Sequence, residues 1–165
     1  MIIFINGTIS SGKSTIAKLL EKKIPNTVVL EIDVLRNLIN WIPLNKAIPL
    51  NLENAVSLIT NFVKRKLNVI VPYPLSQKNY DYLIKNLKSL DTEILFYTLA
   101  PRPEELIKEE RGRKLNDWEK ERVKYHTKTG LTRPSFGKLI DNTNQTPNET
   151  TEVILNSADK KKFLT

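Results

Sequence analysis

The first twenty residues constrain the fold most, because an apolar run, a glycine-rich loop and an amphipathic segment follow one another there. Residues 2–5 are all apolar, and residues 7–14 read GTISSGKS. Beyond the loop, the apolar residues Ile16, Ala17 and Leu20 recur at helical spacing. This order predicts a buried strand, a tight loop and a helix.

The loop fits the pattern G-x-x-x-x-G-K-[ST], whose glycines let backbone N–H groups face phosphate oxygens at a helix N-terminus. In that pattern the Lys13 ammonium neutralises the β- and γ-phosphates, and the Ser14 hydroxyl binds Mg²⁺. The alternative is a glycine turn that happens to precede a lysine, but the strand-to-helix context favours a phosphate site. ATP and Mg²⁺ are therefore the expected cofactors. The residues expected to contact the nucleotide are Gly7, Thr8, Ser10, Ser11, Gly12, Lys13, Ser14 and Thr15.

Composition limits the other possibilities. With 165 residues and 40% apolar content, the chain fits one domain, which we place at residues 1–156 with a flexible basic tail at 157–165. The absence of cysteine excludes disulfides, thiolate metal sites and cysteine nucleophiles. The net charge of +8 suits nucleotides or nucleic acid, and it equally suits simple solubility. The apolar start is too short for a signal or a membrane span, so we expect a cytoplasmic protein without membrane contact.

The rest of the chain alternates between strand-like and helix-like segments. Strands are expected at residues 27–32 (buried), 68–71, 92–99 and 138–140, and helices at 34–42, 53–66, 76–90 and 147–155. Residues 43–51 are expected to form a proline-punctuated connection, and the highly charged residues 104–128 a helical lid. Five strands joined by long crossovers predict a three-layer α/β domain with a five-stranded parallel sheet.

Several polar residues fall at or just beyond the expected carboxyl ends of these strands. They are Gly7, Asp33, Tyr73, Arg102 and Asp141. Because parallel α/β sheets bind ligands outside the carboxyl ends of their strands, we expect these residues to surround one site.

Four motifs in order resemble the small P-loop kinases of the shikimate, gluconate, adenylylsulfate kinase and chloramphenicol phosphotransferase group. They are the phosphate loop, the segment EIDVLR at residues 31–36, the RGR at 111–113, and the DNT at 141–143 followed by Thr146 and Pro147. The similarity spans about residues 2–155, although only the phosphate loop is highly specific. It implies the P-loop NTPase fold, MgATP as phosphoryl donor, a small-molecule hydroxyl as acceptor, a mobile lid, and nucleotide contacts from Asn142 and Thr143.

Asp33 and Arg36 are the most informative pair outside the phosphate loop. The segment is similar to the acidic-x-Asp-x-x-Arg pattern of adenylylsulfate kinase, where the aspartate lies against the acceptor hydroxyl and the arginine holds an anionic group of the acceptor. Judged without the resemblance, Asp33 could still act as a general base. In phosphoryl transfer such a base needs only to reach the acceptor hydroxyl and to have a modest pKa. The alternative is that Asp33 caps the following helix.

The third expected strand lacks the aspartate that usually binds Mg²⁺ in P-loop proteins, because residues 68–71 run directly into Pro72, Tyr73 and Pro74. We therefore expect Asp33, with Ser14, to contact the metal, and Glu31 is the second candidate. Tyr73 either faces the acceptor or only covers the edge of the sheet.

The lid contains Arg111 and Arg113, which resemble lid arginines that meet the transferred phosphoryl group or cover adenine. The alternative is a charged helix face laced with salt bridges. His126 has no acidic residue paired with it in sequence, so we interpret it as an ordinary loop residue. Trp41 and Trp118 are expected to be packing residues.

Together these features predict an ATP-dependent kinase acting on a small-molecule hydroxyl, with Lys13, Asp33, Arg111 and Arg113 as catalytic residues and Asp33, Arg36 and Tyr73 at the acceptor. The alternatives are a nucleic-acid end or nucleotide-sugar kinase and a non-catalytic nucleotide-binding module. Regularly interleaved aromatic and basic residues are missing, which disfavours a nucleic-acid partner. The presence of Asp33 disfavours the non-catalytic module.

Overall fold

The computed structural model describes residues 1–39, 41–107 and 114–158, in which five strands alternate with seven helices. In chain order, the elements are β1 (Ile2–Gly7), α1 (Lys13–Lys23), β2 (Thr27–Val29), α2 (Ile32–Arg36), α3 (Leu44–Lys64), β3 (Asn68–Pro72), α4 (Gln77–Leu87), β4 (Ile94–Leu99), α5 (Pro103–Ile107), α6 (Asp117–Lys128), β5 (Lys138–Ile140) and α7 (Pro147–Ser157).

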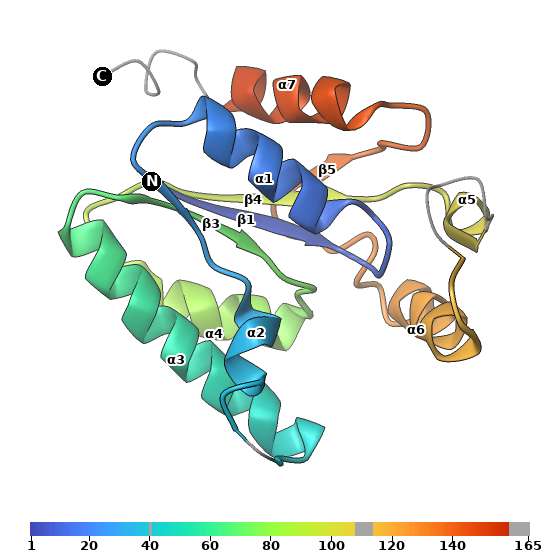
Figure 1. The fold of residues 1–165 in the computed structure, drawn as a ribbon, viewed down its shortest axis with the longest axis horizontal. Helices are drawn as coiled ribbons and strands as arrows, with labels where there is room; N and C mark the ends of the chain where they lie inside the picture. The colour runs from blue at the N-terminus through green and yellow to red at the C-terminus, as the bar shows by residue number, and fades with distance from the viewer. Residues whose placement is uncertain (40, 108–113, 159–165) are drawn as a thin grey trace.

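All the strand pairs are parallel, and the strand order β2-β3-β1-β4-β5 places β1 in the centre of the sheet. Helices α1 and α7 cover one face, and α3 and α4 cover the other (Figure 1). The predicted three-layer fold with a five-stranded parallel sheet is therefore confirmed.

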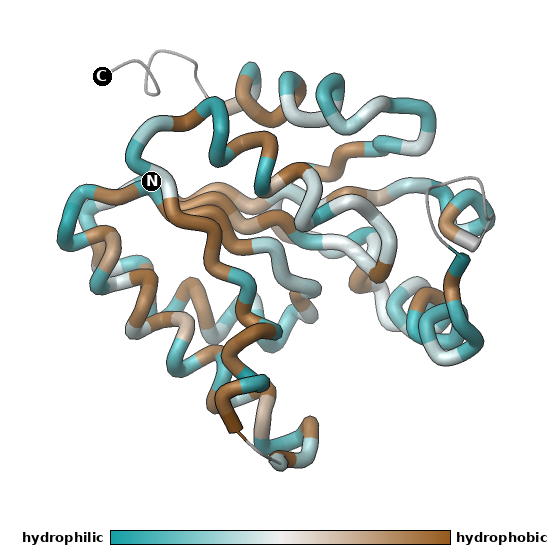
Figure 2. Tube along the Cα trace, viewed as in Figure 1, coloured by the Kyte–Doolittle hydropathy of each residue, from teal (hydrophilic) through white to brown (hydrophobic). Residues whose placement is uncertain are grey.

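Strand β1 divides its side chains between the two halves of the core. Ile2 and Phe4 pack toward α3 and α4, whereas Ile3 and Ile5 pack toward α1 and α7. This alternation follows from the two-residue period of a strand. The strands form the hydrophobic centre of the molecule, and the polar residues lie on its periphery (Figure 2). Burying each of these side chains stabilises the fold by about 1.5–3 kcal/mol. This burial fixes the position of β1, and the phosphate loop begins at the end of that strand.

Several predicted elements were wrong in extent. The helix expected at residues 34–42 is the short α2, which begins at Ile32 and ends at Arg36. The second strand ends at Val29 and is only half-buried, because β2 lies at the edge of the sheet with a single neighbour. The connection expected at residues 43–51 is instead the start of α3, which begins at Leu44. Pro43 is extended at the N-cap, and Pro49 lies inside the helix, where it removes one backbone hydrogen bond without ending it.

The C-terminal helix begins as expected, with a reciprocal capping box between Thr146 and Glu149 and with Pro147 at the first helical position. It runs further than expected, because the Ser157 hydroxyl bonds to the Tyr97 hydroxyl at 2.9 Å and Ala158 is buried. Residues 159–165 of the expected tail lie outside the described residues. Within the described ranges, no helix has both the length and the apolar character needed to cross a bilayer.

Candidate active site

The phosphate loop leads from the end of β1 to the first turn of α1. Gly7 has φ +146°, and a Cβ there would lie 2.5 Å from Ser11 Oγ and 2.8 Å from the Leu99 carbonyl oxygen. Gly12 has φ +99° and is the N-cap of α1. Both glycines are therefore required by the backbone, and the loop brings N–H groups to the positive end of the helix, as an anion site needs.

Lys13 lies at the centre of the loop. Its ammonium donates a hydrogen bond to the Thr8 carbonyl oxygen at 2.7 Å. Burial lowers the pKa of Lys13 to about 8, and the negative charges of Asp33 and Glu31 oppose that shift. Burial raises the pKa of Asp33, and the positive charge of Lys13 opposes that shift in turn. Each of the two charges thus lies close enough to affect the pKa of the other.

A cavity of about 270 Å³ opens beside the loop. Its lining comes from the phosphate loop, the start of α1, and the segment from β5 into α7: Ser10, Ser11, Gly12, Thr15, Ile16, Asn142, Thr143, Gln145, Pro147 and Thr150. The Asn142 side-chain amide donates to the Ser11 carbonyl oxygen at 3.0 Å, which joins the two sides. The expected nucleotide residues Ser10, Ser11, Gly12, Thr15, Asn142 and Thr143 therefore line one cavity.

A nucleotide fits this arrangement. Within the described part of the chain, the buried Ser11 hydroxyl has no hydrogen-bond partner, and leaving such a group unpaired is costly. It lies on the loop whose N–H groups and lysine suit phosphates, beside a cavity close to the size range of small-ligand sites.

The donors available for Mg²⁺ are few. Among the described residues, no three His, Asp or Glu side chains are close enough together to hold a metal. Ser14 is exposed in the first turn of α1, and Asp33 lies in the first turn of α2, where its carboxyl is partly shielded while the residue stays open to solvent. Mg²⁺ commonly takes one or two carboxylates plus substrate phosphates and water. Ser14 and Asp33 therefore fit a metal that arrives with a nucleotide, and their role in binding it remains a prediction.

The far wall of the cavity is fixed by backbone hydrogen bonds. The Arg102 N–H donates to the Thr143 hydroxyl oxygen at 2.9 Å, and the Thr143 N–H donates to Asp141 at 3.0 Å. The Thr143 hydroxyl also donates to Asp141, and these bonds hold the pKa of Asp141 below its usual range. The loop after β5 is thereby tied to the end of β4.

His126 is a site residue that the sequence interpretation missed. It lies in α6, is only 3% exposed, and its Nδ1 is 2.8 Å from the Thr8 hydroxyl. Burial, together with the positive charges of Arg122 and Lys13, lowers the pKa of His126 to about 4. Glu119, Val123 and His126 form the buried stripe of α6 at i, i+4 and i+7. That spacing could have identified His126 as an inward-facing residue.

Asp33 lies in the first turn of α2 and does not cap it, since the N-cap is Glu31 and no side chain caps the helix. Tyr73 is 5% exposed and packs in the core on the α3 and α4 side. Burial, together with the negative charge of Asp33, raises the pKa of Tyr73 to about 12. Tyr73 thus belongs to the core and also neighbours Asp33 electrostatically.

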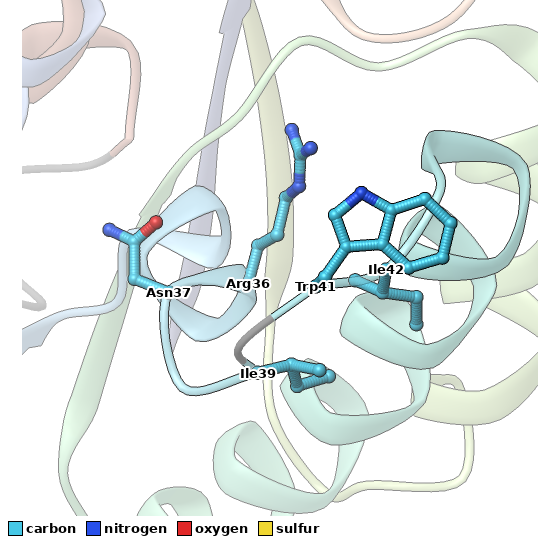
Figure 3. A pocket seen from close by; sticks show the side chains of 5 residues that line it. All are labelled: Arg36, Asn37, Ile39, Trp41 and Ile42. Carbon is cyan, nitrogen blue, oxygen red and sulfur yellow. The ribbon is translucent and has the colours of Figure 1, made fainter.

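A second cavity, of about 400 Å³, lies between α2 and the start of α3. It is lined by Arg36, Asn37, Ile39, Trp41 and Ile42 (Figure 3). Trp41 is 81% exposed, so the expectation that it packs in the core was wrong.

The lid region contains the short α5 and the longer α6, which pack on the tip of the phosphate loop through Leu106, Leu115, Val123 and Ile9. Trp118 is also exposed and was wrongly expected to pack. The Arg122 guanidinium lies 5.9 Å from the ring centre of Trp118 and 5.1 Å from that of Tyr125. Arg111 and Arg113, the expected catalytic arginines, lie outside the described residues.

No protein-family model matches the chain, and a search of curated protein sequences finds no significant match. Solved structures do match. A sugar kinase from Janibacter sp. has a TM-score of 0.73 at 17% identity and covers 94% of this chain and 92% of its own. The tunicamycin resistance protein of Deinococcus radiodurans has a TM-score of 0.66 at 21% identity and covers 95% and 94%.

The APS kinase of Mycobacterium tuberculosis has a TM-score of 0.66 at 17% identity and covers 94% of both chains. At such identities the likeness shows the fold, and the matched proteins reach across almost the whole length. The chain therefore has the fold of the P-loop kinases, a group that includes the shikimate and APS kinases its motifs resemble.

Proposed function

We propose that this chain is an ATP-dependent kinase that transfers the γ-phosphoryl group of MgATP to a hydroxyl group of a small molecule. The observation that carries the proposal is the phosphate loop, whose Gly7 and Gly12 adopt positive φ and whose Lys13 donates to the Thr8 carbonyl oxygen, with a cavity of about 270 Å³ beside it. Asp33 lies on the same short helix as Arg36, which lines the second cavity. The charges of Lys13 and Asp33 affect each other's pKa, which supports a donor side and an acceptor side that lie close together.

MgATP would supply the phosphoryl group and the charge of the metal. The N–H groups of the phosphate loop bind phosphate oxygens. The Lys13 ammonium gives up its hydrogen bond to the Thr8 carbonyl oxygen and binds phosphate oxygens as well. Asp33 orients the acceptor hydroxyl and accepts its proton as the acceptor oxygen bonds to the γ-phosphorus and the bond to the ADP oxygen breaks. The raised pKa of Asp33 suits this role, because a carboxylate whose pKa is closer to neutral pH is a stronger base.

The test is release of ADP from MgATP in the presence of hydroxylated metabolites, nucleosides, sugars and antibiotics, measured with and without each acceptor. We expect acceptor-dependent ADP release and a phosphorylated product detected by mass spectrometry. Lys13→Ala serves as the inactive control. If folded wild-type protein binds no MgATP by calorimetry, the proposal is wrong.

One observation favours a second candidate, a kinase of nucleic-acid ends. Trp118, Arg122 and Tyr125 form an aromatic and cationic stripe on the lid helix, and such stripes stack bases in single-stranded nucleic acid. Labelling of an oligonucleotide 5′-hydroxyl by ATP, with binding that weakens steeply with salt, would select this candidate. Because the stripe is a single short one, the small-molecule acceptor remains our first proposal.

A further inference from the structure

We propose that the cavity between α2 and α3 takes an amphipathic anion, namely an acceptor whose hydroxyl lies beside a carboxylate or phosphate and whose remainder is an apolar ring or chain. The inference rests on the proposed function, because it names the class of molecule that would receive the phosphoryl group. It distinguishes this chain from a kinase of wholly hydrophilic polyols.

Exposed apolar side chains are concentrated in this segment. Val34 is 52% exposed, Leu38 79%, Trp41 81% and Leu44 52%, all within residues 34–44. The other large exposed apolar residues of the described part are spread over α4, α6 and β5. Single exposed apolar residues are ordinary, but a cluster of this kind marks a surface that something else covers.

The charge in the cavity defines the polar part of the ligand. Arg36 and Asn37 are the polar members of the lining, and no carboxylate belongs to it. Among the described residues, no acidic side chain lies within ion-pair distance of Arg36, which is exposed. A guanidinium forms its best pairs with carboxylates and phosphates through two parallel hydrogen bonds. The complementary group is therefore an anion.

The apolar and cationic parts face the same volume. Figure 3 shows the side chains of Arg36 and Trp41 projecting in the same direction, with Ile42 next to Trp41 and Ile39 lower in the lining. Asp33 precedes Arg36 by three residues on α2, and side chains at that spacing are about 5–6 Å apart at Cβ. The reacting hydroxyl and the anionic group of the acceptor are therefore close neighbours, and the apolar part extends toward Trp41.

A small ligand explains this surface better than a second copy of the chain. The cavity volume of about 400 Å³ lies within the range of small-molecule sites. Stable protein interfaces bury roughly 800 Å² on each partner, much more than one short segment offers. A chain with a net charge of +8 also repels its own copy at a surface that carries Arg36, which has no ion pair among the described residues.

The test uses Trp41 as its own reporter. In Trp118→Phe, Trp41 is the only tryptophan, and its fluorescence should shift to shorter wavelength when an apolar group covers it. The probes are used without ATP, and each amphipathic anion is compared with compounds that lack its charge or its apolar part. The sets are 3-phenyllactate with lactate and 3-phenyllactamide, 2-hydroxyoctanoate with its amide, and uridine 5′-monophosphate with uridine and ribose 5-phosphate. We expect at least one amphipathic anion to bind about tenfold or more tightly than its truncated partners.

Variants identify the cavity as the site. Trp41→Ala and Arg36→Gln should each weaken that anion about tenfold, measured by calorimetry. Trp118→Ala removes a similarly exposed tryptophan, and Arg65→Gln an exposed arginine at the far end of α3, and neither should change binding. The proposal is overturned if no anion meets the matched-set criterion, if the control variants weaken binding equally, or if the Trp41 shift depends only on protein concentration.

The outcome is separable from that of the proposed function. An amphipathic anion that binds at Trp41 and Arg36 of a folded protein that binds no MgATP would support the site and refute the kinase. Phosphorylation of a polyol that is unaffected by Trp41→Ala and Arg36→Gln would support the kinase and refute the site.

Discussion

The side of the molecule that we propose binds MgATP (the donor side) and the side that we propose binds the acceptor (the acceptor side) are built in different ways. On the donor side, the phosphate loop is buried and tied down by hydrogen bonds to α6 and to the loop after β5. On the acceptor side, α2 has five residues, its N-cap side chain makes no capping bond, and the residues after it are largely exposed. Under the proposed function, the side that is tied down by hydrogen bonds binds MgATP, and the open side binds the acceptor.

This difference predicts how the two sides respond to substitution. Changes on the donor side should alter catalysis for every acceptor, because positioning of the phosphates is common to all of them. Changes on the acceptor side should alter affinity for particular acceptors and leave MgATP binding unchanged. The predictions below test that division, beginning with the largest expected effect.

Lys13→Ala should lower the rate of phosphoryl transfer at least about 100-fold, since it removes a preorganised charge from the developing transition state. Lys13 makes its described hydrogen bond to a backbone carbonyl of its own loop, so the fold should be retained. The measurements are ADP release and a circular dichroism melting curve. Lys18→Ala, an exposed lysine of the same helix, is the matched control, and equal losses in the two variants would contradict the assignment.

Asp33→Asn should lower kcat about 100-fold, the usual contribution of a positioned general base, with little change in the affinity for ATP. Steady-state kinetics and calorimetry separate the two quantities. Glu31→Gln tests the other acidic neighbour of Lys13. A larger loss in Glu31→Gln than in Asp33→Asn would transfer the role to Glu31.

The affinity for ATP should fall as the pH rises through about 8, the lowered pKa of Lys13. Below that pH the ammonium is charged and available to the phosphates, whereas above it the lysine of the free protein is neutral and must take up a proton on binding. Between pH 7 and pH 9 the loss should reach up to about tenfold. Calorimetry in buffers of different ionisation enthalpy should detect proton uptake near pH 8.5 (about half a unit above that pKa), and an affinity independent of pH would contradict it.

Sequence-based prediction also succeeded in some regions of the molecule and failed in others. The phosphate loop, the alternation of five strands with helices and the capping box of α7 depend on short-range rules that connect residue type directly to backbone shape, and the structure agrees with them. The start of α3 was predicted wrongly because prolines such as Pro43 and Pro49 are typical of a loop. Proline is compatible with the start of a helix, and only longer-range packing shows that this helix continues past Pro49.

Contacts between distant segments were beyond the sequence argument. His126 and Thr8 are 118 residues apart, and nothing local to His126 indicates its partner. The exposure of Trp41 likewise depends on how α2 and α3 are arranged. Only the buried spacing of Glu119, Val123 and His126 provided a signal, and it indicates an inward face without naming what lies opposite.

The contact between His126 and Thr8 leads to the smallest of the predicted effects. The Thr8 hydroxyl meets Nδ1 of His126, and the Thr8 carbonyl accepts from Lys13. We expect His126 to position the phosphate loop from the lid helix. His126→Leu should weaken ATP about fivefold, the equivalent of one hydrogen bond of about 1 kcal/mol. His126→Asn places an amide near the position of Nδ1 and should restore most of the affinity.

Two further measurements separate positioning from a merely structural role. In a double-mutant cycle with Thr8→Val, the effects of His126→Leu and Thr8→Val on ATP affinity should not add, because both remove the same bond. The free energy of unfolding of the wild type should also fall as the pH drops from about 6.5 toward 4, since the unfolded histidine takes up a proton that the folded one resists. His126→Asn should lack that part of the pH dependence. Additive effects on ATP affinity, together with unchanged ATP binding in His126→Leu, would limit His126 to packing the lid.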